Sequence, residues 1–231
     1  MRRKIVMMTG IALMGLFLLV DCGSGDSDAG SGASGSPAKG SSEEVQLLES
    51  GYCLTEDCYL KYGFVIENPS KDTAFEFPVV TVTAYDENGE VLATGDQTMG
   101  KIQPGEKQAF ASLMDCNGKK PDKVAFDIDT GDAIAPSDEA IRSSDFEIAG
   151  TNERTDEYDE TAVTGTIKNN SASDTDSAAV TVLFRKEGKI VCGTTEFVDN
   201  LGAGKEKAFE AAEYGVPEHD AYEVTAIDWG I

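Results

Sequence analysis

The chain has 231 residues, with 42 acidic against 19 basic side chains and a formal net charge of −23 at pH 7. This length has room for two small domains, and a hydrophobic content of 40% is enough for packed cores. Because a phosphate backbone is bound by a basic surface, we expect no nucleic-acid partner.

The first residues have the form of an export signal. Basic residues at positions 2–4 precede an apolar run over residues 5–20, which is about the length of a signal-peptide core and short for a membrane span. Residues 1–21 are therefore interpreted as a signal peptide. The alternatives are an uncleaved anchor, or an ordinary signal that is cut at another residue.

Cys22 follows this run, and the leader resembles the signal peptides of bacterial lipoproteins, in which a cysteine after a short apolar stretch is lipidated and becomes the new N-terminus. Leu19 and Val20 fit the pattern, whereas Asp21 stands where a small residue is usual. The resemblance implies acyl chains, such as palmitate, on Cys22 and a place at the extracytoplasmic face of the cell membrane. Two acyl chains give stable anchoring, since each buried methylene contributes about 0.8 kcal/mol.

Residues 22–44 consist mostly of Gly, Ser, Ala and Asp. Such a segment cannot bury apolar surface, so we expect it to be a disordered linker. A flexible coil of this length spans roughly 25 Å, which would lift a folded body off a membrane.

The rest of the chain contains an internal repeat. Residues 45–68 align without a gap on residues 146–169, so that Asn68 meets Asn169, and IQPGEKQAFA further on matches LGAGKEKAFE. We therefore predict a first unit over residues 45–131, a linker over residues 132–142, and a second unit over residues 143–231.

Each unit is predicted to be all-β. Residues 60–67 alternate apolar and polar side chains, the period of a half-buried strand, and Asn88-Gly89 lies between two apolar runs as a hairpin turn. Six or seven short strands per unit without a helical period predict two tandem immunoglobulin-like β-sandwich domains.

The first unit resembles the FxLYD-type immunoglobulin-like domains of bacterial envelope proteins. The residues that carry this resemblance are Val82, Ala84, Tyr85, Asp86 and Gly89, with Asn68 upstream and Pro104-Gly105 downstream. The likeness covers most of residues 58–130 and is weaker over residues 161–229, where Phe184-Arg185 replaces Tyr85-Asp86. It implies an extracytoplasmic sandwich without an assigned biochemical activity.

Three cysteines of the first unit are candidates for a disulfide in an oxidising envelope: Cys53, Cys58 and Cys116. Cys53 and Cys58 flank a hairpin-sized loop, and Cys58 would instead approach Cys116 if the strands that carry them pair antiparallel, so the connectivity stays open. Cys192 is expected to be a small buried thiol in a strand. Without a well-spaced histidine, these cysteines do not indicate a metal site.

The sequence gives little support to catalysis. His219 is the only histidine, and we expect it in a solvated loop, with no serine or cysteine motif to supply a nucleophile. Acid pairs such as Asp174 and Asp176 arise by chance in so acidic a chain. We therefore expect a protein that is not an enzyme and has no cofactor.

Two further features bear on ligand binding. Asp127, Asp129 and Asp132 are close in sequence, but Gly131 stands where an EF-hand needs an oxygen ligand, so at most a weak, irregular calcium site is expected. Trp229 is expected to fill the core of the second sandwich.

The sequence thus predicts a lipid-anchored, non-catalytic binding or spacer module whose partners are the membrane and an envelope or extracellular protein or glycan. The alternative is a solute-binding or transport-accessory lipoprotein with a ligand between the two domains. Specificity is expected where the two copies differ, in loops at residues 55–57, 70–77, 155–157 and 171–177.

Overall fold

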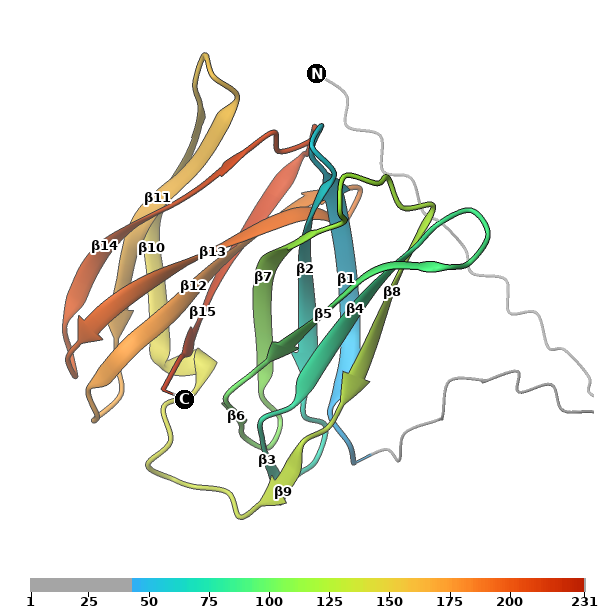
Figure 1. Cartoon of the computed structure of the whole chain (residues 1–231). Helices are drawn as coiled ribbons and strands as arrows, with labels where there is room; N and C mark the ends of the chain where they lie inside the picture. The colour runs from blue at the N-terminus through green and yellow to red at the C-terminus, as the bar shows by residue number, and fades with distance from the viewer. Residues whose placement is uncertain (1–42, 231) are drawn as a thin grey trace, which may run out of the picture. The chain divides into compact units, whose positions relative to one another are not determined.

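The computed structural model describes residues 43–230 (Figure 1). The predicted signal peptide over residues 1–21, Cys22, and all but the end of the predicted linker over residues 22–44 lie outside the described residues. Within residues 43–230, no helix has the length and apolar character that a membrane crossing requires.

The described part of the chain is built from antiparallel strands and one short 3-10 helix, which confirms the predicted all-β fold. The elements of the first half are β1 (Gln46–Leu54), β2 (Tyr59–Glu67), β3 (Ala74–Glu76), β4 (Val79–Tyr85), β5 (Val91–Thr98), β6 (Lys101–Ile102), β7 (Lys107–Asp115), β8 (Lys123–Asp129) and β9 (Asp132–Ile134). Those of the second half are η1 (Ser143–Asp145), β10 (Phe146–Thr155), β11 (Glu160–Asn169), β12 (Thr175–Lys186), β13 (Lys189–Leu201), β14 (Glu206–Tyr214) and β15 (Ala221–Asp228).

Both halves are sandwiches with the same strand order. In the first half, sheet β1-β2-β7 packs on sheet β5-β4-β8, with the small sheet β6-β3-β9 beside them. In the second half, the corresponding sheets are β10-β11-β14 and β13-β12-β15. Alternate side chains of each strand point into the cores, as in immunoglobulin-like sandwiches.

A buried asparagine occupies the same place in each half. Asn68 donates through Nδ2 to the carbonyl oxygens of Thr73 (2.8 Å) and Ile102 (3.2 Å), and its Oδ1 accepts from the Ser70 backbone N–H (3.0 Å). Asn169 makes the equivalent bonds to Ser173 (2.8 Å), Leu201 (3.1 Å) and Ser171 (2.9 Å). Each asparagine ties the end of one strand to the turn that follows and to a distant strand.

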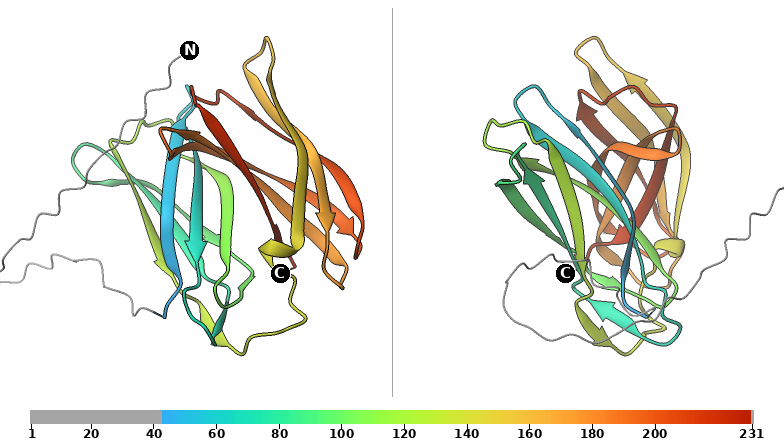
Figure 2. Two further views of the ribbon diagram at one scale, coloured as in Figure 1. Left: turned by 180° about the vertical axis from the view of Figure 1, so that it is seen from behind. Right: turned by 90° about the vertical axis from the view of Figure 1, so that its right-hand side faces the viewer.

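The two halves pack through unlike sheets, β1-β2-β7 of the first and β13-β12-β15 of the second (Figure 2). Small residues allow this close approach: a Cβ on Gly51 would lie 1.9 Å from the carbonyl oxygen of Ile190. Polar contacts fix the register, since Thr181 Oγ1 donates to the Ala109 carbonyl (3.3 Å) and the Ala111 N–H donates to Thr195 Oγ1 (3.1 Å). We call this contact the inter-half interface.

Trp229 belongs to the inter-half interface, which corrects the expectation that it fills the second core. Its ring stacks on Phe110 of the first half, with centroids 4.7 Å apart, and meets Phe197 edge-on at 5.6 Å. The sequence pattern indicated that Trp229 is buried, but the surface that covers it comes from the other copy.

The segment predicted as a linker, residues 132–142, is partly ordered against the first half. It opens with β9, which pairs with β3, and the Ser137 N–H donates to Gln103 Oε1 (3.1 Å). At its end, Arg142 Nη1 donates to the Pro104 carbonyl (3.2 Å).

Candidate functional site

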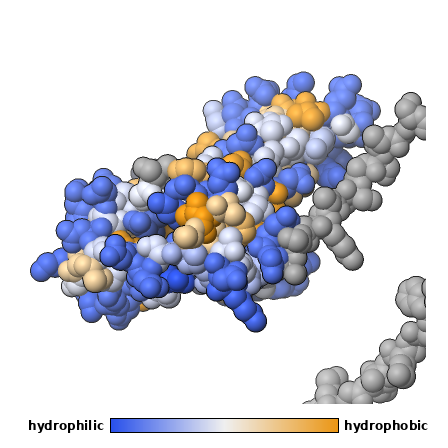
Figure 3. All heavy atoms as spheres, turned by 90° about the horizontal axis from the view of Figure 1, so that it is seen from below, coloured by the Kyte–Doolittle hydropathy of each residue, from blue (hydrophilic) through white to orange (hydrophobic). Residues whose placement is uncertain are grey.

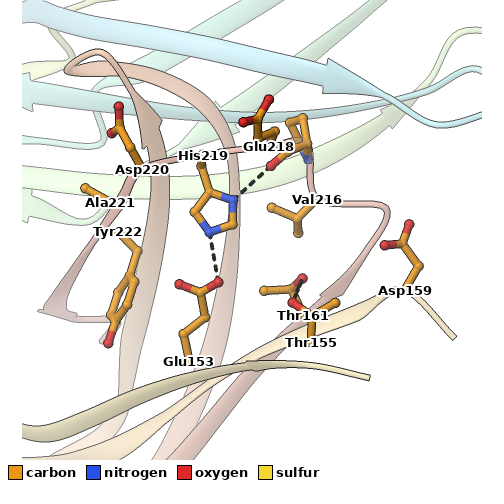
Figure 4. Close-up of a pocket in the computed structure, with 11 residues that line it drawn as sticks. Glu153, Thr155, Asp159, Thr161, Val216, Glu218, His219, Asp220, Ala221 and Tyr222 are labelled. Carbon is orange, nitrogen blue, oxygen red and sulfur yellow. Dashed lines mark hydrogen bonds and ion pairs between the residues drawn. The ribbon is translucent and has the colours of Figure 1, made fainter. Parts of the chain in front are cut away.

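One end of the second sandwich carries a surface pocket of about 570 Å³ (Figure 4). Glu153 and Thr155 reach it from β10, Thr161 from β11, and His219 from the loop between β14 and β15. The pocket therefore forms where the β10–β11 hairpin meets the β14–β15 loop at a sheet end.

His219 is held on both sides of its ring. The side chain is only 13% exposed, and its edge packs against Phe184 with centroids 4.9 Å apart. Nδ1 donates to the Pro217 carbonyl (2.8 Å), which can only accept, and Nε2 lies 2.9 Å from Glu153 Oε1. The expected solvated loop residue is thus a largely buried, doubly bonded one.

Each ring nitrogen of His219 therefore faces an oxygen of a neighbouring residue, and neither points freely into the pocket. The neighbouring hydroxyls of Thr155 and Thr161 bond each other (3.0 Å), and neither serine nor cysteine lines the pocket. Geometry therefore brings together no nucleophile and base here.

Two of the other acids around the pocket already have partners for their side chains. Glu218 pairs with Lys186 (2.7 Å), and this hydrogen bond lowers the pKa of the Glu218 carboxyl. Asp220 accepts from the Glu187 backbone N–H (2.9 Å). Within residues 43–230, no three His, Cys, Asp or Glu side chains come close enough to hold a metal ion.

Replacing Glu153 with alanine is expected to destabilise the fold by about 2 kcal/mol, because a hydrogen bond to a charged group is lost inside a half-closed pocket. The exposed pair partner Glu218 supplies the control, since Glu218→Ala should leave the unfolding midpoint unchanged. Urea denaturation measures both. Equal midpoints for the two variants would contradict a structural role for the Glu153–His219 contact.

The cysteines come together in an arrangement that the sequence did not single out. Cys53 Sγ lies 2.6 Å from Cys192 Sγ, on β1 and β13 of different halves. Cys58 lies next to Cys116, whose backbone N–H donates to the Cys58 carbonyl (3.2 Å). Cys53 packs on the core of the second half, whereas Cys58 packs on the core of the first half. The two cysteines that flank the β1–β2 turn therefore face different cores.

A buried ion pair lies beside Cys53. Lys61, only 6% exposed, reaches from β2 to Glu213 Oε1 (2.7 Å) and to the Tyr214 carbonyl (2.5 Å) on β14. It links the two halves. The hydrogen bond from Cys192 and then the Lys61 charge lower the pKa of the Cys53 thiol, while burial opposes them.

Replacing Lys61 with methionine keeps the apolar stem but leaves Glu213 without its cation. Breaking a buried pair costs several kcal/mol, and the partial exposure of Glu213 reduces the expected loss of stability to about 2 kcal/mol. Lys107→Met is the matched control, because its pair with Glu67 is exposed and 3.7 Å long. Thermal unfolding should separate the two variants, and identical Tm values would refute the role of Lys61 at the inter-half interface.

The remaining candidates occupy structural turns. Asp129 Oδ1 accepts from the Gly131 N–H (2.9 Å), and Asp174 Oδ1 accepts from the Ala203 N–H (2.7 Å). The loops at residues 70–77 and 171–177 hold the two buried asparagines. Several of their polar groups are therefore engaged by the fold, and the expectation that these loops carry specificity stays a prediction.

The fold and its cores define an all-β protein made of two immunoglobulin-like sandwiches. No protein-family model matches the chain, and no curated protein does either. Among solved structures, the chain is similar to the crystal structure of red sea bream transglutaminase at 6% identity, over 79% of this chain and 28% of that one, with a TM-score of 0.26. The chain thus spans less than a third of that enzyme, and a likeness of this degree carries no functional argument.

Proposed function

We propose that the chain is a lipid-anchored, extracytoplasmic protein whose two sandwiches form a non-catalytic binding or spacer module at a bacterial envelope. The observation that carries this proposal is the inter-half interface, where Gly51 lies against Ile190 and Thr181 bonds to Ala109. Such close packing supports one stiff body instead of two swivelling domains. The lipoprotein-like leader and the Gly/Ser linker supply the proposed anchor and reach.

The pocket geometry is compatible with a binding role. His219 has both ring nitrogens engaged, and the hydrophobic side chains on the face in Figure 3 form small groups among hydrophilic ones. No broad apolar patch is visible on that face, so a partner there would meet mostly polar groups.

Exposed tyrosines mark the proposed contact surface. Tyr59 (41% exposed) follows the β1–β2 turn, Tyr158 (75%) lies in the β10–β11 turn, and Tyr214 (56%) ends β14 opposite Glu160. Tyrosine offers a large amphipathic surface with few rotatable bonds, which suits contacts with proteins and glycans. The nearby turns at residues 55–57 and 155–157 are where the two copies differ.

Mass spectrometry of the protein extracted from membranes tests the anchor. We expect a diacylglyceryl mass on an N-terminal Cys22, and loss of both this mass and membrane association in Cys22→Ala. A mature N-terminus at an unmodified residue further along would overturn the anchoring proposal. Crosslinking on intact cells with wild type and Tyr158→Ala/Tyr214→Ala then tests the contact surface, since the double variant should lose its crosslinked partner.

One observation favours the alternative, a small solute held at the junction of the halves. Gln103 is 1% exposed, and its Nε2 has no hydrogen-bond partner within residues 43–230. It lines a cleft of about 310 Å³ together with Ser137, Asp174 and Asp228, and no aromatic ring lines this cleft. A thermal-shift screen of amino acids, sugars and short peptides tests this alternative, and a stabilising ligand should lose its effect in Gln103→Met.

A further inference from the structure

Cys53 and Cys192 face each other across the inter-half interface. Their sulfurs are 2.6 Å apart, closer than the contact of about 4 Å between unbonded apolar groups and only slightly longer than a disulfide of about 2.05 Å. They are separated by 139 positions in the chain, so their approach depends on how the two halves pack.

The backbone around these cysteines holds them in place. Gly51 and Ile190, which precede Cys53 and Cys192 by two positions each, also lie against each other. β1 and β13 are therefore in contact at two successive points. Arg185 adds an ion pair to Glu49 (2.6 Å), which lies two positions before Gly51 on β1. The thiols therefore meet because two strands are already docked.

We propose that Cys53 and Cys192 form a disulfide that covalently joins the two halves of the chain. This inference goes beyond the proposed binding or spacer function and does not depend on which partner is bound. It also differs from the pairings indicated by the sequence, which involved Cys53, Cys58 and Cys116. Cys58 and Cys116 pack together in the first-half core, away from the thiol pair.

The exposure of the two thiols sets the order of the reaction. Cys53 is half-buried and Cys192 is fully buried, so a bulky oxidant reaches Cys53 first. The Lys61 ammonium beside Cys53 favours its thiolate. The hydrogen bond to Cys53 and burial raise the pKa of the Cys192 thiol, which keeps it protonated until the second step.

The oxidant is a small or protein disulfide, R–S–S–R. The Cys53 thiolate attacks one of its sulfurs, which forms a mixed disulfide and releases one thiolate. Cys192 then loses its proton to that thiolate and attacks Cys53 Sγ, which forms the Cys53–Cys192 bond and expels the second thiolate. Two protein thiols are thereby oxidised, and R–S–S–R is reduced to two R–SH that carry the two protons.

The test uses the purified full chain, reduced and then incubated with oxidised glutathione. Free thiols are alkylated in denaturant, and the protein is cut at glutamate, which separates Cys53 from Cys58 because Glu56 lies between them. We expect peptide 50–56 to be linked to peptide 188–196. Alkylation of both Cys53 and Cys192, or a link from Cys53 to Cys58 or Cys116, would overturn the proposal.

Two variants test whether the linked peptide comes from the Cys53–Cys192 pair. Cys192→Ser should abolish this linked peptide and leave Cys53 alkylated, whereas Cys116→Ser should retain the link. The wild type should lose about 10 °C in Tm when reductant is added, because a disulfide across a long loop stabilises by a few kcal/mol. Cys53→Ser/Cys192→Ser should show no such loss. These readouts do not involve Cys22, so they fail or succeed independently of the anchoring proposal.

Discussion

Asn169→Ala is expected to lower the free energy of unfolding by about 3 kcal/mol, because four hydrogen bonds of a fully buried side chain are lost together. The Leu201 carbonyl would remain buried without this partner, and the Ser173 carbonyl and the Ser171 N–H would lose theirs in a partly exposed turn. Asn68→Ala should cost a similar amount, since three of these bonds recur in the first half. Urea denaturation of both variants measures these losses.

Asn170 provides the matched control for this prediction. It is the next residue in the chain, but it is exposed and its Nδ2 donates only to Glu147 Oε2 (3.1 Å). Asn170→Ala should therefore change stability by no more than about 0.5 kcal/mol. If Asn169→Ala lowered the free energy of unfolding as little as this control, water would have to replace the lost hydrogen bonds. Asn169 would then not be needed to hold the strand end to its turn.

Gly51→Ala is expected to weaken the inter-half interface by about 3 kcal/mol, a cost at the upper end for overpacked sites. The added Cβ would lie 1.9 Å from the Ile190 carbonyl oxygen, which is backbone and cannot swing aside. The strands must separate, so the Cys53–Cys192 link should also form more slowly in oxidised glutathione. Thermal unfolding and the linked-peptide yield measure the two effects.

Gly100→Ala separates this effect from the general cost of changing a glycine. Its Cβ would meet only the Asp228 carbonyl oxygen, at 3.9 Å, an ordinary contact distance. We expect a change below about 1 kcal/mol for this variant. A Gly51→Ala protein with wild-type Tm and wild-type crosslinking would show that the halves do not pack through Gly51.

Sequence patterns predicted the strands and turns, whose formation depends on neighbouring residues in the chain. The alternation of residues 60–67 predicted the strand β2 correctly, but not its burial: residues 60–64 are buried on both faces, because β2 also contacts β13 of the other half. Asn88-Gly89 forms the predicted turn, with Gly89 at φ +80. The gapless alignment of the repeat also agrees with the backbone, because the aligned residues Cys58 and Asp159 share the left-handed conformation, at φ 63 and 64. A period of two fixes which face of a strand is buried, and positive φ limits which residues can occupy a turn.

The candidate sites depended on contacts that no local pattern encodes. Cys192 is a buried thiol in a strand, as predicted, but no local pattern indicated its partner Cys53, which lies in the other copy of the repeat. His219 and Trp229 were misplaced for a related reason: their burial depends on Phe184 and Phe110, which distant strands bring to them. Periodicity indicates that a side chain is covered but not by which surface.

The inter-half interface joins different sheets of two similar sandwiches. A sandwich of a second molecule could therefore add to the free sheet in the same way, and repeated addition would build a fibre. The aligned positions prevent this. Where the first half carries the paired glycines Gly51 and Gly63, the second carries Asn152 and Thr164, which are also paired across two strands. Their side chains occupy the space that an incoming sheet would need, so we expect the stack to end at two and the protein to avoid fibre growth.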